Sequence, residues 1–256
     1  MLTRNRIREI KSLENKKERT ETCLFAAEGK KLISDLLDSD IAVEIIYSTP
    51  DQAEMLRKLS VRQPANIVEV PETEIKKISH LKTPQGSLAL CRIPRFGNPG
   101  NAGDKYLSLC LDDIQDPGNF GTIIRLADWF GIRDVFCSPG TVDIYNPKVV
   151  QATMGAISRV RTYYLPLVPF MRDKQSRNVP VYGTFPDGEN IYTASLTSNG
   201  IIILGNEGKG INRELFPFMT MKITIPGFHS GVTKPDSLNV SVAASIIVSE
   251  FRRRRF

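Results

Sequence analysis

Short runs of aliphatic residues alternate along this chain with longer segments of helical periodicity, and this alternation most constrains the fold. Ile201–Leu204 and Val179–Thr184 are dense in Ile and Val, which is typical of strands buried on both faces of a parallel sheet. Asn119–Phe130 and Ser237–Phe251 have the apolar spacing of helices. Strands that alternate with helices predict an α/β protein.

The first 93 residues contain enough elements for a small domain of their own. The expected elements are a helix over Leu2–Glu18, a strand over Cys23–Ala27, a helix over Glu28–Leu37, a strand over Val43–Ser48, a helix over Asp51–Leu59, a strand over Ile67–Val70, a helix over Glu72–Leu81 and a strand over Ser87–Ile93. Pro94–Gly103 is rich in Gly, Pro and Asn, which predicts a linker or an exposed loop. We therefore place an N-terminal α/β domain at residues 1–97.

The rest of the chain alternates in the same way. The expected strands are Tyr106–Asp112, Val135–Ser138, Val160–Tyr164, Val179–Thr184, Ile201–Leu204 and Met221–Ile225, and the expected helices are Asn119–Phe130, Pro147–Ala156 and Ser237–Phe251. This pattern predicts a doubly wound second domain at residues 104–256. Such sheets bind ligands at the carboxyl ends of their strands, so the loops there are expected to carry the chemistry.

Composition and charge restrict the class of protein. The chain has 256 residues, of which 41% are hydrophobic and 24% charged, as in a soluble globular protein. It lacks the run of about 18 apolar residues that a membrane helix needs, and its first 17 residues are charged, unlike a secretory signal. The four cysteines lie far apart without CxxC spacing, which argues against a zinc site or a disulfide framework. We expect a cytoplasmic protein with no membrane partner.

Positive charge is concentrated at the two ends of the chain. Residues 1–31 carry nine Lys or Arg against five Asp or Glu, Arg252–Arg255 add four more, and the net charge is +6. Basic ends on a near-neutral body favour a polyanionic partner, RNA or DNA, because phosphate contacts supply affinity that does not depend on sequence. The alternative is that these ends only keep the protein soluble.

Polar side chains crowd the loop after the first strand of the second domain. Asp113, Asp116 and Asn119 follow that strand closely, Asn119 is expected near the N-cap of the next helix, and Arg125 lies further along it. The alternative is an ordinary turn with a capping Asn and a surface Arg.

Three glycines between Gly205 and Gly210 follow the buried strand Ile201–Leu204. Glycines there let a ligand approach the main chain closely. Their spacing, G-x-x-G-x-G, matches neither a P-loop nor the dinucleotide fingerprint. A nucleoside-like ligand held by main-chain groups is the remaining interpretation of this loop.

The third candidate segment begins with Ile225 and Pro226, continues through a polar loop and resumes at Ser237–Ala244. Small residues at the start of this helix permit close packing of a ligand or of another backbone. The alternative is a core helix capped by Asp236 or Ser237.

Few other side chains offer chemistry. Of the two histidines, His80 is expected to be structural and His229 to be a candidate substrate contact. The lone Trp129 is expected to pack in the core or at an interface. No group of residues has metal-ligand spacing, so no metal is expected.

Taken in order, these segments resemble the three motifs of the SpoU (TrmH-like) branch of the SPOUT RNA methyltransferases. Asp116–Arg125 resembles D-P-x-N-x-G-x-x-x-R, Gly205–Gly210 resembles G-x-E-G-x-G, and Ile225-Pro226 with Ser237–Ala243 resembles I-P followed by S-L-N-V-S-V-A. Pro147–Ala156 resembles a further family segment, and residues 4–97 resemble the small substrate-binding domain that many members carry. The family has Glu where Asp236 stands and Ser where Thr153 stands, and its loop is shorter than Gly227–Pro235.

The resemblance implies a fold and a cofactor. The fold is an N-terminal substrate-binding domain followed by an α/β-knot domain, with a trefoil-knotted, mostly parallel sheet. The cofactor is S-adenosylmethionine, bound largely by main-chain groups, and no metal is implied. The matching cofactor positions are Leu204, Gly205, Asn206, Gly208, Ile225 and Leu238. Members are generally homodimers whose active sites lie near the subunit interface.

The resemblance also implies a reaction, methylation of a ribose 2′-hydroxyl of RNA, with rRNA favoured over tRNA because of the N-terminal domain. It gives Arg125 the central catalytic role, and Asn119, Glu207, Ser237 and Asn239 would orient Arg125 and the ribose. Two other classes stay open: a non-catalytic RNA-binding ribosome-assembly factor that kept the fold, and a nucleotide-dependent oxidoreductase. The intact polar residues disfavour the first, and the missing dinucleotide fingerprint disfavours the second.

Overall fold

The computed structural model describes residues 1–59, 62–97, 99–101, 103–228 and 237–253. The chain divides into two compact units, each formed by two separate stretches of sequence. The first unit comprises residues 1–95 together with residues 143–159, and the second comprises residues 96–142 together with residues 160–256. His229 and Asp236, together with most of the loop Gly227–Pro235, lie outside the described residues.

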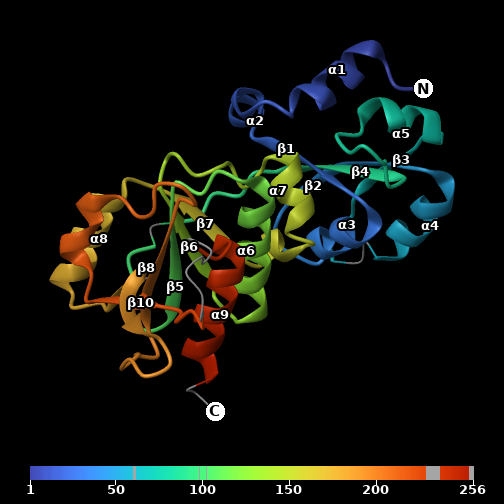
Figure 1. The fold of residues 1–256 in the computed structure, drawn as a ribbon. Coiled ribbons are helices and arrows are strands. Elements are labelled where there is room, and N and C mark those ends of the chain that lie inside the picture. Colours follow the sequence, from blue (N-terminus) through green and yellow to red (C-terminus); the bar gives the residue numbers. More distant parts are fainter. Residues whose placement is uncertain (60–61, 98, 102, 229–236, 254–256) are drawn as a thin grey trace. The chain divides into compact units, whose positions relative to one another are not determined.

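The first unit is built on a four-stranded mixed sheet (Figure 1). Its strands are β1 (Leu24–Glu28), β2 (Val43–Ser48), β3 (Asn66–Glu69) and β4 (Ser87–Arg92). In the sheet order β1-β4-β2-β3, β4 runs antiparallel to β1 and β2, and β2 runs parallel to β3. The carboxyl ends of β1, β2 and β3 therefore share one edge of the sheet.

Helices surround this sheet. They are α1 (Arg4–Ser12), α2 (Lys16–Thr22), α3 (Lys30–Leu37), α4 (Pro50–Leu59), α5 (Glu72–Ile78), α7 (Pro147–Ala152) and the short 3₁₀ helix η1 (Ala156–Ser158). Ile10 and Leu13 pack with Ile75 and Ile78 of α5 in one buried apolar cluster. Helix α7 packs against β1, although about 120 residues separate them in the sequence.

The N-terminal region differs from the single helix expected over residues 2–18, because the chain breaks between α1 and α2. The guanidinium of Arg19 donates hydrogen bonds to the carbonyl oxygens of Leu13 and Glu14, each at 2.8 Å. Arg19 is 2% exposed. Since a buried Arg satisfies the carbonyls at the break, two short helices replace one long one. The apolar pattern over residues 2–18 does not predict this break, because the break depends on Arg19, which lies outside that pattern.

The second unit contains six parallel strands (Figure 1). They are β5 (Leu107–Asp112), β6 (Asp134–Cys137), β7 (Arg161–Tyr164), β8 (Val181–Asn190), β9 (Gly200–Gly205) and β10 (Met221–Thr224), in the order β10-β8-β9-β5-β6-β7. From β5 the chain proceeds through β6 to β7 at one edge and then crosses over to β8. The strand order therefore switches direction between β5 and β9, where doubly wound sheets place their ligands. The predicted α/β class and parallel sheet are confirmed.

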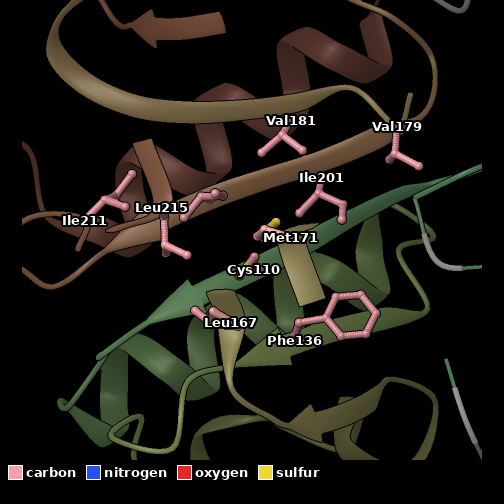
Figure 2. Close-up of a cluster of buried hydrophobic side chains, with 10 residues drawn as sticks. Cys110, Phe136, Leu167, Met171, Val179, Val181, Ile201, Ile211 and Leu215 are labelled. Carbon is pink, nitrogen blue, oxygen red and sulfur yellow. The ribbon is translucent and has the colours of Figure 1, made fainter. Parts of the chain in front are cut away.

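Helices cover both faces of this sheet. Helices α6 (Pro117–Trp129) and α9 (Val240–Arg253) pack against each other on one face, and α8 (Leu167–Ser176) and the 3₁₀ helix η2 (Arg213–Phe218) pack together on the other (Figure 1). Figure 2 shows the cluster beneath α8, in which Met171 and Leu215 pack with Cys110 and Ile201. These strand residues are fully buried.

Four elements within residues 104–256 differ from the prediction. Helices α8 and η2 were not expected. Pro169 lies in the first turn of α8, where proline is tolerated, and η2 contains Pro217. The segment expected as one helix over residues 147–156 ends at Ala152, and Gly155 then adopts a φ of +96°. Helix α9 begins at Val240 rather than Ser237.

The segment expected to be a linker or an exposed loop is attached to the second unit. The buried ammonium of Lys174 donates to the carbonyl of Gly100 at 2.7 Å, and Arg177 forms an ion pair with Asp104. Gly103 is buried against Val179 and Ile201. The composition of this segment shows that it has few apolar residues. It does not show that Lys174 and Arg177 hold the segment in place. No helix in the described ranges is long and apolar enough to cross a membrane.

Candidate active site

The loop after β5 is held from two sides. The main-chain N–H of Asp113, which has a φ of +59°, donates to Ser138 Oγ at 2.8 Å. The side chain of Asp116 accepts the N–H of Asn119 at 2.7 Å, so Asp116 is the N-cap of α6. Asn119 was expected near that cap position. Because Asp116 serves as the cap instead, the carboxamide of Asn119 is available for other contacts.

The loop after β9 is a compact turn. Asn206 and Gly210 exchange two main-chain hydrogen bonds of 3.1 and 2.9 Å, and Asn206 Oδ1 accepts the N–H groups of Gly208 and Lys209. A Cβ on Gly205 would lie 2.5 Å from the main chain of Gly210 and Ile211, so only glycine fits there. The Asn206 side chain therefore shapes the turn from within.

These two loops are bonded to each other. Asn206 Nδ2 donates to the carbonyl of Asp113 at 2.8 Å, and the N–H of Asn212 donates to Asp112 Oδ2 at 2.7 Å. Burial raises the pKa of Asp112, against the opposing effect of the hydrogen bond from Asn212. Neither Asp112 nor Asn212 was predicted as a site residue. The only sequence signal for these two residues is their position. Asp112 is a carboxylate at the end of the strand before the predicted loop, and Asn212 is a polar residue after the glycines.

One hydrogen-bonded chain joins residues from all three motifs. Asn119 Nδ2 donates to Glu207 Oε1 at 2.8 Å, and Asn119 Oδ1 accepts from Asn239 Nδ2 at 2.9 Å. Asn239 Oδ1 in turn accepts the N–H and hydroxyl of Ser241 at 2.9 and 2.7 Å. Asn239 therefore caps α9; the alternative interpretation of this segment placed the cap at Asp236, which lies outside the described residues, or at Ser237. The structure brings three of the five predicted catalytic residues together.

The other two predicted catalytic residues lie outside this chain of hydrogen bonds. Arg125 is exposed on α6, and its guanidinium makes no hydrogen bond or ion pair with the described residues. Ser237 is also exposed, just before α9. None of the donors of Arg125 is therefore used by the described residues.

Comparisons with known proteins identify the family of this chain. The sequence matches the model of the SpoU rRNA Methylase family over residues 106–249, more than half of the chain. The chain belongs to the SpoU rRNA methylase family. Residues 4–89 also match the MRM3-like substrate binding domain. The match to the SpoU family covers all three motif segments predicted from sequence.

Similar proteins cover the whole chain. One relative, the 23S rRNA (guanosine(2553)-2′-O)-methyltransferase RlmP of Bacillus subtilis, is 29% identical over 254 residues, covering 96% of each chain. The structure of a TrmH-family protein from Porphyromonas gingivalis is 40% identical, covers 99% of both chains and superposes with a TM-score of 0.89. The AdoMet-bound rRNA methyltransferase from Sinorhizobium meliloti is 29% identical, covers 100% of this chain and 97% of its own, and has a TM-score of 0.87.

The SpoU residues predicted to bind the cofactor lie at the ends of two strands. Leu204 is buried, Gly205 ends β9, and Ile225 directly follows β10. Strand β8 pairs with β9 only as far as Ile203, so the edge of β9 beyond that residue has no partner on the β8 side. A nucleoside cofactor held by main-chain groups fits this unpaired edge.

The remaining SpoU positions border the same loops. A Cβ on Gly208 would meet only Asn206 Oδ1, at 3.6 Å, so the main chain of Gly208 is accessible. Leu238 is 50% exposed. No group of three His, Cys, Asp or Glu side chains within the described residues is placed to hold a metal ion.

His80 and Trp129 also have defined surroundings. His80 is structural, because its ring Nε2 lies 3.1 Å from the carbonyl of Ile10 and its main-chain N–H donates to Glu28 Oε1 at 2.6 Å. Trp129 is 82% exposed at the end of α6, so its prediction as a core residue is wrong and its prediction as an interface residue stays open.

Proposed function

We propose that this protein transfers a methyl group from S-adenosylmethionine to a ribose 2′-hydroxyl of rRNA. The observation that carries the proposal is the hydrogen-bonded chain Glu207–Asn119–Asn239. It joins three distant SpoU motifs at the carboxyl ends of β5 and β9, beside a strand edge that β8 leaves unpaired. A binding-only descendant of the family has no need to keep these polar contacts.

The cofactor site comprises mainly main-chain groups. We assign it to Leu204, Gly205, Asn206, Gly208, Ile225 and Leu238. When bound, S-adenosylmethionine supplies an electrophilic methyl group on its sulfonium. The protein's part is to hold the ribose oxygen in line with that methyl group, because orientation contributes much of the barrier reduction in such a displacement.

Arg125 serves as an electrophilic clamp in this proposal rather than as a base. A free guanidinium has a pKa above about 12 and is a very poor proton acceptor. Its five donors suit a phosphate and a hydroxyl oxygen. Asn119, Glu207, Ser237 and Asn239 then position the ribose and Arg125 once RNA is bound.

The proposed substrate is rRNA, with tRNA as the alternative. RlmP acts on 23S rRNA by its name, and it is similar to this chain from end to end. We further assign RNA recognition to an N-terminal domain at residues 1–97, in line with the match to the MRM3-like substrate binding domain. With rRNA as the substrate, we assign the reaction to the cytoplasm.

A homodimer is the proposed assembly, with the catalytic domain at residues 104–256 threaded as a trefoil knot. Exposed apolar side chains on two helices that pack together support the dimer: Trp129 of α6 is 82% exposed and Val242 of α9 is 47% exposed. Aromatic residues of this size are enriched in interface cores. A second copy of the chain would cover Trp129, on the helix that carries Arg125.

The test uses purified protein, labelled S-adenosylmethionine and total RNA from a strain that lacks the gene. The RNA is separated by size, digested and searched for a 2′-O-methylated nucleoside. Label in an rRNA is the expected result, and label confined to tRNA would contradict the proposed substrate. No label in naked RNA or in ribosomal precursor particles would favour the binding-only alternative.

A further inference from the structure

A buried ion pair links α2 to a segment that follows β6 by several residues. Arg19 Nε donates to Asp143 Oδ2 at 2.9 Å, and its Nη2 forms the second prong to the same oxygen. Arg19 is 2% exposed and Asp143 is 13% exposed. Arg19 Nη1 binds the carbonyls of Leu13 and Glu14, so this one guanidinium fixes both the α1–α2 break and Asp143.

Asp143 is held in place by more than this pair. Its Oδ1 accepts the N–H of Tyr145 at 3.1 Å, and the ring of Tyr145 lies 4.9 Å from the ring of the fully buried Phe25. Burial raises the pKa of Tyr145, which keeps its hydroxyl neutral. Residues 143–159 are thus built into the first unit, although they lie within the SpoU match.

The residue before Asp143 is bonded to the loop after β5. Val142 donates its N–H to the carbonyl of Ile114 at 2.9 Å, and its own carbonyl accepts the hydroxyl of Tyr164 at 2.6 Å. Ile114 is buried and lies two residues before Asp116, the N-cap of α6. The position of Asp143 is therefore tied by one peptide link to the loop that leads to Asn119.

Other residues of the same short segment contact that loop directly. Ser138 Oγ accepts the N–H of Asp113, and Thr141 Oγ1 donates to the carbonyl of Leu111 at 3.1 Å. A Cβ on Gly140 would lie 2.4 Å from Asp113 Oδ1. Asp113 also accepts from Asn206 through its carbonyl, which extends the contacts to the turn that carries Glu207.

We propose that Asp143 is a positioning residue: its buried pair with Arg19 holds residues 138–142 so that the loop Asp113–Asp116 presents Asn119 correctly. The expected effect on catalysis rests on the proposed function. The expected effect on the position of the loop Asp113–Asp116 does not. Coupling of this kind requires a direct measurement, since a chain of contacts alone does not demonstrate it.

The experiment compares hydrogen exchange and methyl transfer in the full-length wild type, Asp143→Asn and Arg19→Met. Both variants are expected to speed amide exchange in the peptide that covers residues 111–118. They should also lower kcat about 2- to 30-fold, the range of coupling energies measured along such networks. The double variant should be no slower than the slower single variant, because both changes break the same pair.

A matched control separates positioning from general stability. Arg161 and Asp134 form another two-pronged pair, at 2.8 and 3.0 Å, but on partly exposed strand residues away from the loop. Asp134→Asn should leave exchange in residues 111–118 and kcat at wild-type values. If Asp143→Asn lowers only the melting temperature and leaves both readouts unchanged, Asp143 is merely structural and the proposal is overturned.

A second variant covers the case in which the buried-pair variants fold poorly. Gly140→Ala leaves Arg19 and Asp143 intact but pushes the Asp113 carboxylate. It is expected to speed exchange in residues 111–118 and lower kcat, without changing exchange in residues 13–25. Wild-type kcat and exchange in this variant would overturn the proposed link. If the wild type methylates no RNA, the proposed function fails, and the exchange comparison alone still decides whether Asp143 holds the loop.

Discussion

Asn119 donates a 2.8 Å hydrogen bond to Glu207, a residue 88 positions later in the chain. Asn119→Asp replaces this donor with a second carboxylate facing Glu207. We expect kcat/KM for methyl transfer to fall about 10- to 100-fold, because a charge-assisted hydrogen bond becomes a repulsion. Adding Glu207→Gln should restore part of the activity, since an amide can then donate to the new carboxylate. A double variant as slow as Asn119→Asp would contradict this account.

At the turn after β9, we expect Gly208 to tolerate a side chain and Gly205 not to tolerate one. Gly205→Ala would place a methyl group 2.5 Å from the main chain of Gly210 and Ile211. Overpacking of this kind costs about 1–3 kcal/mol, which corresponds to a fall in Tm of about 2–12 °C for a domain of this size. Gly208→Ala meets only Asn206 Oδ1 at 3.6 Å and should keep the wild-type Tm. Differential scanning fluorimetry of both variants decides the matter, and equal Tm values would refute the contrast.

The elements of the fold could be predicted from sequence where local pattern determines them. β2 was expected at Val43–Ser48 and lies there, and polar residues crowd the strand end before Asn119 as expected. The site's three motifs could be ordered from sequence but their contacts could not. The bond from Asn119 to Asn239 spans 120 residues, and no local pattern encodes it.

The features that could not be predicted depend on tertiary contacts of single charged residues. Arg19 splits the first helix because it is buried on Asp143, and Lys174 holds the expected linker. Both residues have the sequence surroundings of surface cations. Trp129 is the opposite case. A large aromatic residue is usually buried, but this one is exposed.

Protonation of His80 is expected to destabilise the protein in mild acid. Burial lowers the pKa of His80, and the nearby charges of Lys11 and Arg19 act in the same direction, against an opposing effect of Glu14. Its Nδ1 is buried and makes no hydrogen bond among the described residues. Below the ordinary pKa near 6.5 the unfolded chain therefore takes up a proton that the folded chain refuses, so stability falls as pH falls.

The measurement is chemical denaturation of wild type and His80→Gln between pH 7.5 and 5.5. For one proton the loss is at most about 1.4 kcal/mol per pH unit. His80→Gln should lose less stability than wild type over this range, because Gln does not titrate. Parallel curves for the two proteins would show that His80 does not set this dependence.

The exposed aromatic residue on α6 provides a test of the proposed dimer. Trp129→Glu replaces this exposed aromatic side chain with a charge, and burying an unpaired charge in an interface is costly. We expect sedimentation to change from dimer to monomer. Tyr106→Glu is the control, because Tyr106 is 70% exposed next to the amino end of β5, away from the active-site loops. A dimer that survives Trp129→Glu would place the interface elsewhere.

Arg125 offers the most direct test of the proposed chemistry. Its guanidinium has no partner among the described residues, so substitution should leave the fold intact. Removing a positioned donor from a reacting oxygen typically lowers kcat about 100- to 1000-fold, and we expect this of Arg125→Ala. Arg125→Lys should recover little, because one ammonium cannot replace the two-pronged fork.

The control for Arg125 is Arg133→Ala, which removes another exposed arginine of the same unit outside the motifs. This variant should weaken RNA binding slightly at most and keep kcat. Single-turnover methylation with saturating S-adenosylmethionine separates the chemical step from RNA binding. A wild-type rate in Arg125→Ala would exclude Arg125 both as a clamp and as a base, and the catalytic role would then pass to the Asn119–Glu207 pair.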